Sequence, residues 1–253
     1  MFISELSKQI ESSQTLNSLH FPRNIRVQFR EEEFMLRWLP PNVSTFGGDI
    51  DFFFHVIYYI TSSVFVLVML TLVYFLIRYR FKPGRKVIYS HGNNTLEFIW
   101  TSVTFVAMLV LALASKPLWS RVKQQMPPSD ITVQVTGKQF NWEVLYPGPD
   151  NIFGTEDDYQ IDNQLHVPVN KVVHVVLKSK DVIHSFFVPA LRLKQDAVPG
   201  REIPVWFEAT KPGTYEIPCA ELCGFGHSGM LGHLYVHADE DYDAWKQATW
   251  PEK

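Results

Sequence analysis

One run of residues decides how the second half of the chain must fold: Cys219-Ala220-Glu221-Leu222-Cys223-Gly224-Phe225-Gly226-His227-Ser228-Gly229-Met230. It holds the only two cysteines of the protein, together with an imidazole and a thioether. Soft sulfur donors combined with imidazole select copper. Ligands carried on a loop need a rigid sheet scaffold to hold them in place. The run therefore predicts a β domain with a metal site at one end.

The spacing of these ligands leaves more than one kind of site open. Cys223, His227 and Met230 alone have the ligand order of a mononuclear blue-copper loop. With Cys219 added, two thiolates can bridge two copper ions, each of which takes one His and one weaker ligand. A disulfide between the two cysteines is sterically possible but strained in a tight loop. A zinc site prefers four Cys or His ligands and does not use Met.

Copper at this loop needs a second imidazole from elsewhere in the chain. The segment Asp181-Val182-Ile183-His184-Ser185-Phe186 offers His184 as the candidate. Other histidines compete for the role, but most of them sit in alternating strand patterns, where a packed or exposed imidazole is the safer interpretation. These competitors are His166, His174, His233 and His237.

The chain from Ile131 onward has the pattern of short β-strands separated by turns. Alternating or β-branched runs are typical of strands, and Gly and Pro mark the turns between them. Short strands at regular spacing indicate an all-β sandwich or barrel. The expected strands span residues 131–136, 171–177, 205–207 and 232–237, with turns at 147–149, 198–200 and 211–213.

These motifs together resemble subunit II of the haem–copper cytochrome c oxidases. The resemblance rests on residues 219–230, called the copper loop below, on residues 181–186, on Gly137–Trp142 and on Lys194–Arg201. It extends over about residues 52–237. It implies two transmembrane helices followed by a cupredoxin-like Greek-key β-barrel. By position it implies a dinuclear copper A centre held by His184, Cys219, the backbone carbonyl of Glu221, Cys223, His227 and Met230.

The resemblance also implies partners and a place in respiration. Cytochrome c, or an equivalent small donor, delivers electrons to the copper centre, which passes them to haem in subunit I for oxygen reduction and proton pumping. A copper A subunit of a nitric oxide reductase is an alternative, and a membrane-anchored copper-binding or assembly protein is another. A quinol oxidase subunit lacks the copper ligands that are present here. The net charge of −3 gives no indication of nucleic acid binding.

Four further residues take roles only through the resemblance. Glu221 reaches, through its side chain, a magnesium ion shared with the catalytic subunit, and a hard carboxylate suits a hard cation. Glu97 marks a proton-uptake entrance, although a carboxylate at a helix N-terminus is also favoured by the helix dipole alone. Phe140 and Trp142 occupy the motif where electrons arrive. The family has Trp at the position of Phe140, and this departure favours a donor that docks elsewhere or is tethered.

Two apolar runs predict membrane spans. Phe52–Ile77 is long enough to cross a bilayer, and Phe98–Ala114 becomes so with its flanking aromatic residues. The loop between them carries five basic residues, which predicts that it faces the cytoplasm or matrix. The β domain then lies on the periplasmic or outer side of a bacterial inner membrane. The five basic residues are Arg78, Arg80, Lys82, Arg85 and Lys86.

The expected organisation has three parts. They are an N-terminal tail over 1–49, a helical hairpin over 50–120 and the copper domain over 121–253. The tail shows no apolar signal-peptide core, and Met35 is an alternative start for the protein. An acidic turn at residues 150–158 suggests calcium through Asp150, Asp157 and Asp158, but its spacing matches no EF-hand loop and favours a solvated turn.

Overall fold

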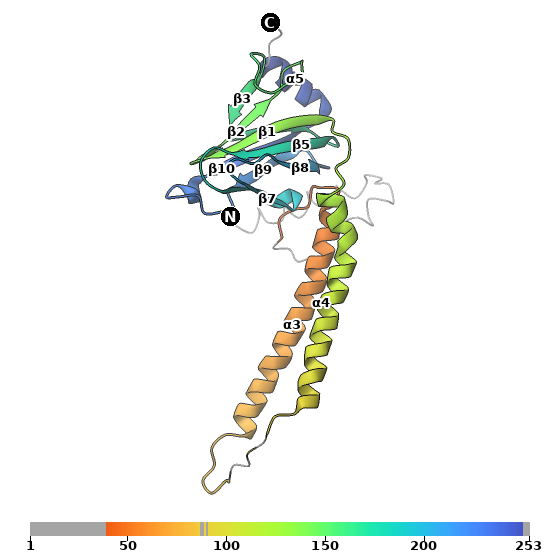
Figure 1. Cartoon of the computed structure of the whole chain (residues 1–253), viewed down its shortest axis with the longest axis vertical. Helices are drawn as coiled ribbons and strands as arrows, with labels where there is room; N and C mark the ends of the chain where they lie inside the picture. The colour runs from red at the N-terminus through yellow and green to blue at the C-terminus, as the bar shows by residue number, and fades with distance from the viewer. Residues whose placement is uncertain (1–38, 87–88, 90, 250–253) are drawn as a thin grey trace, which may run out of the picture. The chain divides into compact units, whose positions relative to one another are not determined.

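The computed structural model describes residues 39–86, 89 and 91–249 (Figure 1). The chain divides into two compact units, Met1–Pro40 and Pro41–Lys253. Every helix and strand given below belongs to the second unit. The expected alternative start at Met35 and most of the expected N-terminal tail lie outside the described residues.

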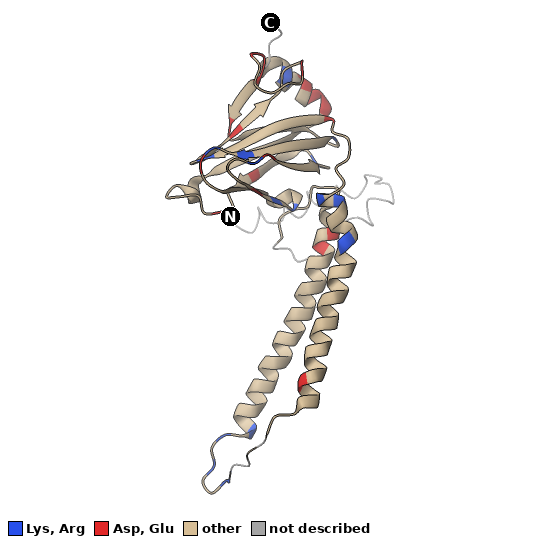
Figure 2. Ribbon diagram, viewed as in Figure 1, with Lys and Arg blue, Asp and Glu red and all other residues tan. Residues whose placement is uncertain are grey.

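Two long apolar helices form the first half of this unit. Helix α3 spans Gly47–Arg78 and helix α4 spans Asn94–Lys123. Each is long enough to cross a hydrocarbon layer of about 30 Å, and the most apolar window of each has no residue buried inside the chain. Figure 2 shows that the charged residues of both helices lie near their ends. A lipid bilayer or a partner subunit must therefore cover them, and the two predicted membrane spans are confirmed.

Helix α4 extends further than the sequence suggested. The sequence predicts a span that ends at Ala114, whereas the helix continues through Pro117 to Lys123. Proline removes one backbone hydrogen bond from a helix interior. The last turn is held instead by the β domain, because Trp206 Nε1 donates to the carbonyl of Val122 at 3.1 Å.

The β domain consists of ten strands in the described part of the chain, arranged in a five-stranded sheet, a three-stranded sheet and a two-stranded hairpin. The strand order is β3-β2-β1-β5-β8 in the first sheet, β4-β10-β9 in the second and β6-β7 in the third. The bounds are β1 Ile131–Lys138, β2 Asn141–Tyr146, β3 Tyr159–Asp162, β4 Gln164–Pro168, β5 Val172–Ser179, β6 His184–Val188, β7 Leu193–Ala197, β8 Ile203–Glu208, β9 Gly213–Pro218 and β10 Leu231–His237.

One hydrophobic core lies between the sheets. Side chains alternate across a strand, and β1 and β5 bury every second residue accordingly. Val133 and Val175 from the large sheet share this core with Leu165 and Leu234 from the small sheet, all of them fully inaccessible to solvent. Burying a side chain of this size contributes about 1.5–3 kcal/mol. The predicted architecture of a helical hairpin followed by an all-β domain is confirmed.

A short helix covers one end of this domain through a stack of rings. Trp245 of α5 (Asp239–Thr249) lies parallel to the His166 ring, with centroids 4.4 Å apart. The opposite face of His166 stacks on Tyr235 at 4.5 Å, and its Nδ1 lies 2.8 Å from Nε2 of His237. Burial lowers the pKa of His166 to about 4 and also lowers the pKa of His237.

We expect the stability of the β domain to depend on pH through His166. Its pKa in the folded state lies below the usual value of 6.5, so the unfolded chain binds a proton first as the pH falls. The resulting stability is complete above pH 6.5 and is lost progressively down to about pH 4. With allowance for solvent screening the loss is about 2 kcal/mol.

Urea unfolding of the full-length protein between pH 4 and 7 measures this dependence. His166→Phe keeps a flat ring in the stack but cannot titrate, so its stability should vary less over this range. His233→Gln, which leaves the stack in place, is the control. An unchanged pH dependence in His166→Phe would contradict the assignment.

Candidate metal centre

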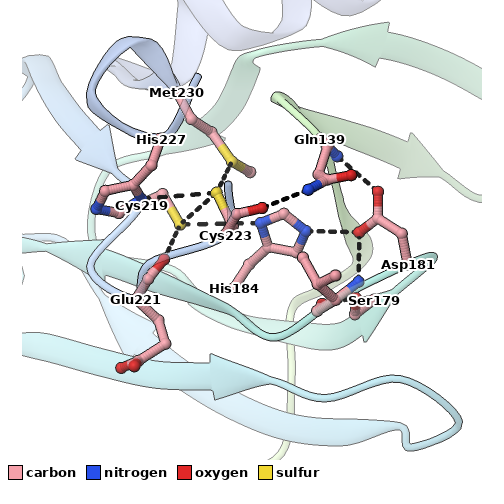
Figure 3. A network of polar contacts seen from close by, with 10 residues as sticks. Gln139, Ser179, Asp181, His184, Cys219, Glu221, Cys223, His227 and Met230 are labelled. Carbon is pink, nitrogen blue, oxygen red and sulfur yellow. Dashed lines mark hydrogen bonds and ion pairs between the residues drawn. The ribbon is translucent and has the colours of Figure 1, made fainter. Parts of the chain in front are cut away.

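Two cysteine thiols and one imidazole form the centre of the site (Figure 3). Sγ of Cys219 lies 3.9 Å from Sγ of Cys223 and 3.9 Å from Nδ1 of His184. Donor atoms of these three residues all lie within 4.8 Å of one another. The backbone carbonyl of Glu221 lies 3.2 Å from Cys219 Sγ. The site therefore gathers residues that are 35 positions apart in the chain.

Cys223 has two further neighbours that extend the site on its other side. Nδ1 of His227 lies 3.6 Å from its Sγ, and Sδ of Met230 lies 3.8 Å away. All six positions expected from the sequence thus lie around the pair of sulfur atoms. His166, His174, His233 and His237 do not join the metal-ligand cluster found among the described residues.

Strand pairing explains why the loop adopts this shape. The antiparallel pair β9 and β10 places Pro218 opposite Leu231. The next residues continue the pairing, because Cys219 N–H donates to the carbonyl of Met230 at 3.0 Å. Ala220 N–H donates to the carbonyl of Ser185 at 3.0 Å, which ties the loop to β6 next to His184. The copper loop is therefore closed at its base by the sheet.

Burial gives the thiols an unusual electrostatic setting. His184 is fully buried, and Cys219, Cys223 and Met230 are 8%, 3% and 1% exposed. Burial raises the pKa of the Cys223 thiol to about 11, with a further contribution from Cys219. Two thiolates in this place need a cation beside them, since a buried charge is costly unless it is paired. A bound metal ion supplies that charge.

The donor set fits copper better than the other sites considered. Both cysteines are free, and their sulfur separation of 3.9 Å is far from the roughly 2.05 Å of a disulfide. Zinc sites are built from Cys, His and carboxylate ligands, which leaves the buried Met230 thioether without a role. Thiolate, imidazole and thioether together match the preference of copper.

A second layer of hydrogen bonds holds His184 and the loop, and the sequence reasoning missed it. Asp181 Oδ1 lies 2.8 Å from Nε2 of His184, which leaves Nδ1 facing the sulfur atoms. Asp181 Oδ2 accepts from the backbone N–H of Gln139 at 2.7 Å. The Gln139 side chain donates to the carbonyl of Cys223. Both residues belong to motifs noted in the sequence, but only the fold shows what they touch.

The two aromatic residues expected at the point of electron arrival have different surroundings. Phe140 is 39% exposed, and its ring lies against the copper loop, where a Cβ added at Gly226 would be 2.5 Å from the ring. Trp142 is 1% exposed and packs edge-on to His184, with ring centroids 6.0 Å apart. Only Phe140 therefore offers a surface to a soluble partner.

Glu97 lies apart from this site. It is in the first turn of α4, whose N-cap Asn93 accepts hydrogen bonds from the backbone N–H groups of Thr95 and Leu96. The three aspartates of the acidic turn make contacts within their own loop. Asp150 and Asp158 accept from the backbone at Ile152 and Gly154, and Asp157 accepts from Thr155.

Comparisons with known proteins agree with this architecture in both halves of the chain. Residues 35–118 match the transmembrane domain of cytochrome C oxidase subunit II, and residues 150–234 match its periplasmic domain. An alternative cytochrome c oxidase subunit 2 from Bradyrhizobium diazoefficiens is 34% identical over 232 residues, which cover 82% of each chain. Cytochrome c oxidase subunit 2 from Thermostichus vulcanus is 31% identical over 264 residues, covering 83% of this chain and 77% of that one.

A third relative and one solved structure complete the comparison. Cytochrome c oxidase subunit 2 from Cereibacter sphaeroides is 32% identical over 235 residues, covering 81% of this chain and 77% of that one. The crystal structure of the periplasmic domain of cytochrome oxidase subunit II from Bradyrhizobium japonicum is 35% identical, with a TM-score of 0.45, and covers 49% of this chain and 96% of that chain. On the identity and coverage of these relatives, the chain belongs to the cytochrome c oxidase subunit II family.

Proposed function

We propose that this protein is the electron-accepting subunit of a respiratory oxidase and that its site holds a dinuclear copper A centre. The observation that carries the proposal is the buried pair of free thiols, 3.9 Å apart, with an imidazole beside each. The two thiols, with His184, His227, Met230 and the carbonyl of Glu221, would hold the copper, which would supply a one-electron redox centre that changes shape little on reduction. The chain's own residues set where that centre lies and how electrons reach it.

The ligands divide into two groups around the bridging pair Cys219 and Cys223. The imidazoles of His184 and His227 lie on opposite sides of the two sulfur atoms (Figure 3), with the carbonyl of Glu221 beside Cys219 and the thioether of Met230 beside Cys223. Each metal position then has one imidazole and one weak ligand.

We assign the arrival of electrons to Phe140, although its departure from the family's Trp favoured a donor that docks elsewhere or is tethered. Its ring is partly exposed and lies on the copper loop, so a donor that touches this ring comes close to Cys223. Trp142 is buried and packs against His184 from inside the domain. The donor in this proposal is a cytochrome c or a similar small carrier, and the acceptor is haem in the catalytic subunit of the oxidase.

The remaining roles follow from position. The five basic residues from Arg78, the last residue of α3, to Lys86 favour the cytoplasmic side for the loop between α3 and α4 and the outer side of the membrane for the β domain. Glu97, at the loop end of α4, would then lie where protons are taken up. The exposed side chain of Glu221 points away from the sulfur atoms (Figure 3) and could offer its carboxylate to a magnesium ion shared with the catalytic subunit.

The full-length protein in detergent should bind two copper ions per chain. Cys219→Ser and Cys223→Ser should each retain at most one, because a hydroxyl does not replace a bridging thiolate. Met126→Leu, outside the site, is the matched control. Metal analysis together with protein quantification gives the number of copper ions per chain. A single copper ion in the wild type would contradict the dinuclear assignment, and so would a native disulfide between the two cysteines.

Phe140→Ala should slow reduction of the copper centre by cytochrome c by roughly tenfold, since removal of a surface aromatic anchor commonly costs 1 kcal/mol or more at an interface. Phe140→Trp should be at least as fast as the wild type because indole offers a larger contact with a hydrogen-bonding edge. Stopped-flow measurements at matched ionic strength compare the three. Equal rates in all of them would show that the donor docks elsewhere or is tethered.

Reporter fusions test the orientation. A reporter after Lys253 should be active only outside the cytoplasm, and one inserted between Arg80 and Lys86 only inside it, because basic loops are retained on the cytoplasmic side. The reverse pattern would place the copper centre out of reach of an external cytochrome c.

A further inference from the structure

Strands β6 and β7 form a hairpin whose open end carries a copper ligand. His184 begins β6 and pairs with Ala197 at the end of β7, while Val188 pairs with Leu193 next to the turn. Four residue steps separate His184 from Val188, which is about 13 Å at the rise of a β-strand. Contacts that hold the turn end of this hairpin therefore act on the position of His184 through β6, in addition to the bonds that Asp181 and the copper loop make at the other end.

Both membrane helices hold the hairpin near that turn. Arg192 donates from Nε to Oδ1 of Asp51 at 2.7 Å and from Nη2 to Oδ2 at 3.1 Å, so α3 is attached by a two-pronged ion pair. Lys123 at the end of α4 donates from Nζ to Oε1 of Gln195 at 2.8 Å. Arg192 also donates to the carbonyl of Pro189 inside the turn.

The backbone of Arg192 indicates that its side chain is needed there. Its φ is 56°, in the left-handed region, which non-glycine residues adopt at a cost of about 1 kcal/mol or more and which Gly or Asn occupy more readily. Asp51 is 3% exposed, although a carboxylate is rarely buried without a partner. The strained Arg192 and the buried Asp51, which are joined by two hydrogen bonds, therefore form a specific structural contact.

The chain just before α3 reinforces the same attachment. Val43 N–H donates to the carbonyl of Ala190 at 2.9 Å, and its own carbonyl accepts from Thr210 N–H at 2.8 Å. The Ser44 hydroxyl donates to the carbonyl of Leu191 at 3.0 Å. The turn of the hairpin is thus bonded to the start of α3 through both backbone and side chains.

We propose that Asp51 and Arg192 are a positioning pair that fixes the copper end of the hairpin at a set distance from the membrane, and so from the acceptor in the catalytic subunit. The proposal rests on the electron-transfer function proposed above. Electron transfer between fixed centres falls steeply with distance, so a hairpin free to tilt would slow the passage of electrons out of the copper centre while leaving their arrival unchanged.

Two substitutions separate this role from folding. Arg192→Gly removes the guanidinium, including its bond to the Pro189 carbonyl, but it suits the positive φ and keeps the backbone bond from N–H of residue 192 to the same carbonyl, so the turn keeps its backbone conformation. Asp51→Asn keeps the size of the side chain but not its charge. If the residues act through each other, the double variant should behave like either single one, because the two changes remove one interaction. Asp49→Asn, whose ion pair with Arg121 is half-exposed and joins only the two helices, is the matched control.

The first measurement uses the assembled oxidase. After rapid reduction of the copper centre, we expect its electrons to reach the haem roughly tenfold more slowly in Arg192→Gly and Asp51→Asn, since small displacements of reacting partners are costly in rate. In these two variants the copper spectrum and the rate of reduction by cytochrome c should match those of the wild type. The control, Asp49→Asn, should match the wild type in all three measurements. Wild-type haem reduction in both variants, or an equal slowing of both steps, would overturn the proposal.

The second measurement does not need copper. Hydrogen exchange of the full-length, metal-free protein should be faster over residues 189–197 and 43–46 in both variants, and unchanged over the copper loop. Unchanged exchange at the hairpin turn would overturn the positioning role even if the proposed electron-transfer function holds. If the wild-type chain does not bind copper, the proposed electron-transfer function is refuted. The exchange measurement still tests the contact between Asp51 and Arg192 in that case.

Discussion

The arrangement of the β domain depends on keeping two thiols together in a place that water does not reach. Cys219 and Cys223 lie 3.9 Å apart and are almost fully buried, and burial raises the pKa of Cys223. Such a pair is unfavourable as two anions unless a cation lies between them. The residues around the thiols supply ligands for that cation, and the sheet supplies the rigidity to hold them.

Support for the site comes from two directions. Inside the β domain, the backbone pairing of Cys219 with Met230 closes the copper loop, and Asp181 with Gln139 joins His184 to that loop. Toward the membrane, Asp51 and Arg192 attach the hairpin that carries His184 to the first helix. The first set of contacts fixes ligand geometry, and the second fixes where the whole centre lies. An electron carrier needs both, since its rate depends on the centre and on the distance to the next one.

The sequence could reveal the ligands because copper chemistry demands particular residue types at short spacings. The four loop ligands stand within twelve positions, and the motif around His184 supplied the fifth side chain. The membrane helices could be recognised equally well, because an uninterrupted run of about twenty apolar residues matches the thickness of the hydrocarbon layer. The end of α4 was not visible, since the bond from Trp206 to the carbonyl of Val122, which joins that end to the β domain, follows only from the tertiary fold.

Contacts between distant segments were hidden for the same reason. Asp51 and Arg192 are separated by 141 positions, and each alone resembles an ordinary charged residue near a helix end or a turn. Gln139 appeared only as part of a motif, and its bond to the Cys223 carbonyl requires the turn after β1 to meet the copper loop. Patterns of residue type indicate local chemistry and periodicity, whereas such pairings follow from the tertiary fold.

The electron paramagnetic resonance spectrum of the copper-loaded, full-length protein tests the central claim most directly. One unpaired electron shared equally by two copper nuclei gives a hyperfine pattern from both, because the bridging thiolates join them. The structure predicts that pattern in the wild type and its collapse to a single-copper pattern in Cys219→Ser. A single-copper pattern in the wild type, with full copper loading, would contradict the account.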